Sequence, residues 1–149
     1  MQISEFLANP QIQVICQLIL AVLLGASVGL EREIKKRGAG LQTYSLVTLG
    51  SCLFTLIALS LAKLEIIDPS PIILAIAIGM GFIGAGAIFR GGAQIQGLTT
   101  AAGLWTTAAI GLAVGSGFYF LAISTTFLVV LILAGFGLAE KNFFSKDSQ

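Results

Sequence analysis

Four short polar groups interrupt an otherwise apolar sequence, and their residue types could bind ions. The polar residues are Glu31, Arg32, Glu33, Gln42, Thr43, Arg90, Thr99 and Thr100. The unpaired N–H groups that begin a helix attract an anionic group or an internal carboxylate such as Glu31. Ion binding or ion pairing is therefore the chemistry that these residues favour.

Other kinds of chemistry are excluded by the inventory of side chains. The chain has no histidine, so Ser-His-Asp and Cys-His nucleophiles and histidine-ligated metals cannot form. Cys16 and Cys52 lie far apart within apolar runs, and we interpret both as small core residues. We therefore expect no enzyme and no cofactor. A net charge of +1 provides no basic field for nucleic acid.

The composition shows which solvent the elements around these residues occupy. The chain has 149 residues, of which 56% are hydrophobic and 10% charged, and its mean hydropathy is +0.98. Soluble domains carry about 25% charged residues, because their surface must be hydrated. Continuous apolar runs such as 72–76 are untypical of a membrane β-barrel, whose strands alternate. We therefore expect an all-α integral membrane protein.

The charged residues divide the chain into apolar intervals long enough to cross a bilayer, which takes about 20 residues. The last uncharged interval is too long for one crossing, and Gly115-Ser116-Gly117 marks a turn within it. We expect a single domain with five transmembrane helices and no soluble C-terminal domain. Because the first nine residues contain no Lys or Arg, no cleaved signal peptide is expected. The expected spans are about 12–30, 42–62, 71–89, 98–114 and 118–138.

The basic residues predict the orientation of these helices. Threading five spans places seven of the eight basic residues on one side, in the 31–41 loop, at Arg90, and at Lys141 and Lys146. Lys63 alone lies on the other side. Cytoplasmic loops are enriched in Lys and Arg, so we expect the N-terminus outside and the C-terminus in the cytoplasm.

Glycines recur at spacings that allow close contact between helices. Gly25 and Gly29 form one pair, and Gly111 and Gly115 form another. Such spacings let helix backbones approach closely in lipid. The third helix is richer still, with Gly79, Gly81, Gly84 and Gly86. Its glycines predict tight packing or, alternatively, a locally unwound segment whose carbonyl groups line an ion path.

Trp105 lies seven residues inside the fourth helix, about 10 Å below the cytoplasmic face at 1.5 Å per residue. This depth exceeds that of an interfacial tryptophan. We expect it to pack within the bundle and to donate its indole N–H there, or to form the wall of a site.

The expected topology brings all four polar groups to the cytoplasmic face. The second and fourth helices begin there, where Thr43, Thr99 and Thr100 could act as caps. The alternative is an ordinary girdle of interfacial charges and caps. Lys35 follows Glu31 by four residues, so the two could form a helical ion pair.

The motifs together resemble the MgtC/SapB family of bacterial membrane proteins. They are Gly25-Ala26-Ser27-Val28-Gly29-Leu30-Glu31-Arg32-Glu33, Ala39-Gly40-Leu41-Gln42-Thr43, the run from Gly79 to Ile88, and Gly97-Leu98-Thr99-Thr100-Ala101-Ala102-Gly103-Leu104-Trp105. The resemblance spans about residues 14–137. It implies a multi-pass protein of the bacterial plasma (inner) membrane, linked to growth in low magnesium and, in pathogens, to virulence. Gln42 and Gln96 depart from the family, whose members often have basic residues there.

Two hypotheses for the function follow. In the first, the protein regulates another membrane protein when magnesium is scarce. The protein could also associate with copies of itself as a homo-oligomer, most simply as a dimer. In the second, an oligomer transports magnesium. Magnesium sites normally supply carboxylates, and no acidic residue lies inside any expected span, which favours regulation.

The expected topology has a direct test. Cysteines introduced at Asp68 and Arg90 should react with a membrane-impermeant maleimide from opposite sides of the membrane, because a single expected span, 71–89, separates them. Labelling of intact and of permeabilised cells measures this. Reaction of both positions from the same side would show the predicted topology to be wrong.

Overall fold

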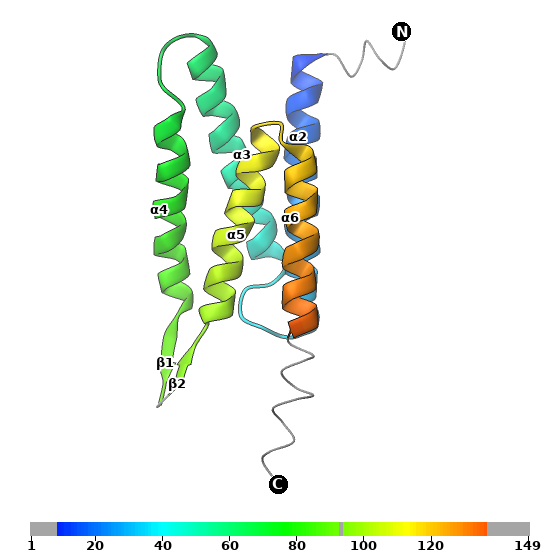
Figure 1. The fold of residues 1–149 in the computed structure, drawn as a ribbon, viewed down its shortest axis with the longest axis vertical. Helices are drawn as coiled ribbons and strands as arrows, with labels where there is room; N and C mark the ends of the chain where they lie inside the picture. The colour runs from blue at the N-terminus through cyan, green and yellow to red at the C-terminus, as the bar shows by residue number, and fades with distance from the viewer. Residues whose placement is uncertain (1–8, 93, 137–149) are drawn as a thin grey trace.

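The computed structural model describes residues 9–92 and 94–136, which form five α-helices and one small hairpin (Figure 1). The strands β1 (Phe89–Gly91) and β2 (Gln94–Gln96) pair antiparallel, with Arg90 opposite Ile95. The helices are α2 (Pro10–Ile34), α3 (Leu41–Lys63), α4 (Ser70–Ala87), α5 (Leu98–Gly115) and α6 (Tyr119–Leu131), which continues into a π-helical turn, η1 (Ile132–Phe136). The all-helical architecture is thus confirmed, apart from the hairpin. Each helix lies at an expected position.

The helices are arranged around α5, which contacts α2, α3, α4 and α6. The edge helix α4 packs mainly on α5, and the hairpin projects beyond the end of the bundle (Figure 1). α2, α3, α4 and α5 are each long and apolar enough to cross a membrane, whereas the apolar helix that begins at Tyr119 is shorter. Together with the apolar surface described next, these helices indicate a membrane protein.

Large apolar side chains cover the outer surface, whereas many buried residues are small or carry a hydroxyl group. Large side chains such as Phe82 and Phe120 are 84% and 86% exposed. The interior instead contains alanines, glycines and the buried hydroxyl groups of Thr48, Ser51, Thr55, Thr100, Thr107 and Thr126. A soluble protein has the opposite distribution. This pattern is typical of a bundle whose solvent is lipid and whose helices associate through close packing and hydrogen bonds.

Glycines bring the backbone of α3 against both α2 and α5. A Cβ atom on Gly25 would overlap the Thr48 hydroxyl, and one on Gly29 would lie 2.7 Å from the Leu41 Cα. On α5, a Cβ on Gly111 would overlap the Thr48 carbonyl oxygen, and one on Gly115 would lie 2.8 Å from the Cys52 carbonyl oxygen. Both glycine pairs therefore act in helix packing.

Two side-chain hydrogen bonds between helices reinforce these contacts. The Ser51 hydroxyl on α3 donates to the Ala108 carbonyl on α5 at 2.6 Å, and Gln17 Nε2 on α2 donates to the Val114 carbonyl at 3.0 Å. Hydrogen bonds of this kind stabilise helix pairs in lipid by about 1 kcal/mol each.

Side-chain acceptors cap the helices where they begin. Asn9 Oδ1 accepts from the Gln11 N–H at the start of α2, and Glu33 Oε2 accepts from the Leu41 N–H at the start of α3. Before α4, the Asp68 carboxylate accepts from the backbone N–H and the hydroxyl of Ser70. These two hydrogen bonds hold the pKa of Asp68 below its usual value.

The third helix ends earlier than expected. α4 stops at Ala87 rather than Phe89, and the chain then forms the hairpin, which the sequence analysis missed. Gly97 returns the chain to α5 with a φ of +88°, and a Cβ there would overlap the Ala87 carbonyl oxygen. The hairpin thus replaces the expected short loop, because Gly97 lets the chain pass close to the Ala87 carbonyl group as it enters α5.

Two expectations about side-chain environment were wrong or only partly right. Trp105 is 52% exposed, because it lies on the one stripe of α5 that no neighbouring helix covers. Of the glycines on α4, only Gly84 packs, against Ala101. A Cβ atom added to Gly79, Gly81 or Gly86 would have no neighbouring atom within 4 Å outside its own helix. α4 is also a continuous helix rather than an unwound segment.

Some residues on which the predictions rest lie outside the described part of the chain. They are the basic residues Lys141 and Lys146, the last residues of the fifth span (137–138), and the first eight residues used to judge a signal peptide.

The glycine contacts predict a difference between two matched substitutions. Gly111→Ala forces α3 and α5 apart and should destabilise the protein by about 1–3 kcal/mol, as overpacking does. Gly79→Ala has open space and should be neutral or slightly stabilising, because alanine favours helix. Thermal unfolding in detergent, followed by circular dichroism, compares the two. Equal melting temperatures would contradict the packing role of Gly111.

Candidate functional site: a buried charged cluster

A cluster of charged side chains lies where α2 ends, against the first turns of α3 and α5. Lys35 Nζ is 2.7 Å from Glu31 Oε1, and Arg32 Nη1 is 4.0 Å from Glu31 Oε2. The side chains of Glu31 and Arg32 are 10% and 6% exposed. The predicted Glu31–Lys35 ion pair is therefore present, and it is largely shielded from solvent.

Arg32 extends this cluster to α3 and α5. Its Nη2 donates to Thr100 Oγ1 at 3.4 Å, and the Tyr44 hydroxyl donates to the Thr100 carbonyl oxygen at 3.4 Å. Both bonds are long, and Arg32 Nε has no hydrogen-bond partner within the described residues. The guanidinium group thus links α2 to Thr100 of α5, Tyr44 links α3 to the same residue, and Arg32 Nε keeps donor capacity to spare.

Lys35 connects the same cluster to the end of α6. Its Nζ donates to the Leu133 carbonyl at 2.8 Å and to the Ala134 carbonyl at 3.3 Å, both in η1. Carbonyl groups at a helix C-terminus carry partial negative charge, so a lysine there is favourable. The ammonium group therefore serves the Glu31 carboxylate and the end of α6 at once.

The other predicted site residues lie at this end of the bundle but outside the cluster. Glu33 is exposed and caps α3. Gln42 and Thr99 are exposed, and Thr43 is half-buried. Arg90 is exposed on β1. The structure thus joins Glu31, Arg32 and Thr100, and of the remaining five residues only Glu33 caps a helix. The expectation that Thr43, Thr99 and Thr100 act as caps was wrong, because the N-cap residues of α3 and α5 are Gly40 and Gly97 and the threonines lie within the helices.

Tyr44 and Lys35 complete the cluster, although the set of predicted site residues omitted both. Tyr44 is fully buried, and a Cβ on Gly103 of α5 would lie 2.6 Å from its hydroxyl oxygen. A signal for Tyr44 was available in the sequence. The polar residues Tyr44, Thr48, Ser51 and Thr55 recur at helical spacing and mark one face of α3.

The arrangement favours ion pairing over metal binding. The Glu31 carboxylate faces two cationic side chains, which oppose the approach of a divalent cation. Within residues 9–92 and 94–136, no three His, Cys, Asp or Glu side chains gather closely enough to hold a metal ion. The cluster is therefore a candidate for stabilising and orienting the helix ends rather than for coordinating magnesium directly.

A double-mutant cycle tests the coupling between Glu31 and Lys35. Lys35→Met leaves a buried carboxylate without its nearest cation and should cost about 1–3 kcal/mol. Adding Glu31→Gln should recover part of this loss, giving a coupling of about 0.5–3 kcal/mol. Unfolding in mixed micelles measures each free energy, with exposed Lys63→Met as the control. Strict additivity of the two substitutions would contradict the ion pair.

Comparisons with known proteins give the family context for this cluster. The chain is 43% identical over 129 residues to a protein of Escherichia coli K12 named "Putative magnesium transporter YhiD", covering 82% of this chain and 60% of that protein. It is 38% identical over 134 residues to Protein SrpB of Synechococcus elongatus, covering 80% and 72%. It is 40% identical over 116 residues to Protein MgtC of Salmonella typhimurium, covering 78% and 49%.

The chain therefore spans about half to three-fifths of the length of YhiD and MgtC. No solved structure matches it. The model of the MgtC family matches residues 18–142, a range that includes the whole cluster and every helix except the start of α2. This match and the identities to YhiD, SrpB and MgtC show that the chain belongs to the MgtC family.

Proposed function

We propose that the protein crosses the bacterial plasma membrane five times, with its N-terminus outside and the charged cluster at the cytoplasmic face. The short helix α6 supports this number. Its first residue, Tyr119, shares a cavity with Gln17 of α2, and its continuation η1 meets Lys35. From Gln17 to Lys35, α2 rises about 27 Å, close to the thickness of the hydrocarbon core, which is about 30 Å.

We further propose that the protein supports adaptation to low magnesium by regulating another membrane protein. The observation that carries this proposal is the environment of Glu31. In the described part of the chain, it is the one acidic residue that does not count as exposed, and Lys35 and Arg32 already neutralise it. A pathway for magnesium through this bundle would have to displace that ion pair.

The surface at the same end of the molecule supports contact with a partner. The hairpin places Arg90 and Ile95 opposite each other, and both are exposed. On the adjoining helix α4, Gly79 and Gly86 face open space, which lets another helix approach closely. This surface suits another membrane protein or a second copy of the chain, in which case a dimer is the simplest assembly.

Magnesium transport is the second candidate, and the similarity to YhiD favours it. YhiD carries the name "Putative magnesium transporter", and the alignment covers 60% of its length. In this alternative, several copies of the bundle would form the pathway, with Glu31 at its rim. The two candidates make opposite predictions about ion flux by the purified protein.

Magnesium uptake into proteoliposomes tests the proposal. Purified wild-type protein, a Glu31→Gln variant and empty liposomes are compared using a trapped fluorescent magnesium indicator. We expect wild-type protein to give the same uptake as empty liposomes. Uptake above that control which falls in Glu31→Gln would overturn regulation and establish transport. Thermal unfolding of each protein confirms that the comparison involves folded chains.

A growth experiment tests the regulatory surface separately. In cells whose growth in low magnesium depends on this protein, the Arg90→Ala variant should fail to support growth, because the hairpin would lose its cation. Lys63→Ala, an exposed basic residue at the other end of the bundle, should grow as wild type does. Immunoblots show whether the variants reach equal levels in the membrane. Normal growth of Arg90→Ala would contradict a role of the hairpin in regulation.

A further inference from the structure

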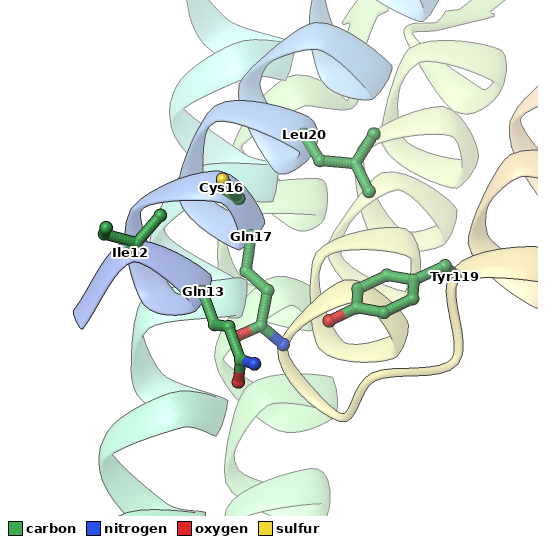
Figure 2. A pocket seen from close by; sticks show the side chains of 6 residues that line it. All are labelled: Ile12, Gln13, Cys16, Gln17, Leu20 and Tyr119. Carbon is green, nitrogen blue, oxygen red and sulfur yellow. The ribbon is translucent and has the colours of Figure 1, made fainter. Parts of the chain in front are cut away.

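A cavity of about 260 Å³ lies at the opposite end of α2 from the charged cluster. Five of its lining residues come from the first three turns of α2, and Tyr119 at the start of α6 closes it (Figure 2). The lining residues are Ile12, Gln13, Cys16, Gln17, Leu20 and Tyr119. The inference below rests on the proposed membrane-spanning position of α2 but not on regulation or transport of magnesium, so flux and growth can fail to support those functions while the cavity still binds its ligand.

The polar groups of the cavity are all uncharged side chains. The polar ends of Gln17 and Tyr119 point toward each other across it (Figure 2). Gln17 Nε2 is held by its hydrogen bond to the Val114 carbonyl at 3.0 Å and has a second N–H to donate. Tyr119 adds a hydroxyl donor at the other wall. Since none of the lining residues in the described part of the chain is charged, the cavity suits a neutral ligand with hydrogen-bond acceptors rather than an ion.

The depth of the cavity along α2 restricts the class of ligand further. Ile12 and Leu20 lie about 3 Å and 15 Å along α2 from its first residue, at 1.5 Å per residue. α2 is about 37 Å long, which exceeds the hydrocarbon core of about 30 Å. With α2 spanning the bilayer, the cavity runs from the headgroup region into the outer part of the hydrocarbon core. A diacyl lipid has its glycerol esters and the first carbons of its chains at this depth.

We propose that this cavity is a binding site for one diacyl phospholipid, held by its glycerol-ester segment. The ester carbonyls accept hydrogen bonds from the second N–H of Gln17 and from the Tyr119 hydroxyl. The adjoining acyl chain packs against Leu20, on the core side of Gln17, and the charged headgroup extends past Ile12 into water. The uncharged wall matches the uncharged ester segment, and Tyr119 combines an apolar ring with a polar tip, as interfacial tyrosines do.

Native mass spectrometry of the detergent-purified protein tests the site with phosphatidylethanolamine as the probe. Cys16→Trp fills the cavity, whereas Ile15→Trp places the same ring on the neighbouring exposed position outside it. We expect wild type and Ile15→Trp to retain one lipid per chain, and Cys16→Trp to lose it. Equal retention by all three proteins would overturn the site, because it would show lipid bound around the bundle without preference.

Two milder changes test the hydrogen bonds without altering the shape of the cavity. Tyr119→Phe should weaken lipid binding about fivefold, the effect of one neutral hydrogen bond of about 1 kcal/mol. A diether analogue with the same headgroup and chains lacks the carbonyl acceptors of both hydrogen bonds and should bind wild type more weakly than the diester lipid binds Tyr119→Phe. If the diether lipid bound as well as the diester, ester recognition would be disproved even if Cys16→Trp failed to fold.

The native cysteines provide an independent measurement. Cys16 is exposed on the cavity wall, whereas Cys52 is buried and serves as an internal control. Added diester lipid should slow alkylation of Cys16 by N-ethylmaleimide at least threefold, and the diether lipid should slow it less. An unchanged rate would contradict occupation of the cavity.

Discussion

The close approach of α3 to α2 and α5 is the constraint on which the rest of the structure depends. Glycines at 25 and 29 on one side, and at 111 and 115 on the other, leave no space for a Cβ atom. Lipid offers little hydrophobic drive for helix association, so contact between backbones must supply much of the attraction. Once α3 is held between its neighbours, its polar face reaches α5, and the Ser51–Ala108 hydrogen bond can form.

The same constraint explains why charge can be buried at one end of the bundle. The ends of α2, α3 and α5 lie close enough for Arg32 to reach Thr100 and for Tyr44 to fill the space above Gly103. A buried carboxylate is tolerated only when cations compensate it, and Lys35 does so while also binding the end of α6. The cluster thus forms because the helices pack closely, and its contacts in turn stabilise that packing.

The sequence predicted the axial positions of residues well and their directions poorly. Uncharged intervals located all five helices, since the spacing of charges records length along the membrane normal. Glycine spacing also identified the contacts at Gly25, Gly29, Gly111 and Gly115. Direction around a helix axis is different, because in lipid both the inner and outer faces are apolar. Trp105 and Gly79 therefore point outward although nothing in the hydropathy distinguishes their face.

The charged cluster shows the same limit at a single site. Eight polar residues were placed at one end of the bundle, yet only Glu31, Arg32 and Thr100 converge, because side chains at one level can point in any direction. Tyr44 joins them since it lies on the face of α3 that the glycines draw inward. The two ends of α2 consequently differ in kind: a self-neutralised ionic network at Glu31 and an uncharged cavity at Gln17. A ligand at one end of α2 would therefore meet ionic side chains, whereas a ligand at the other end would meet uncharged ones.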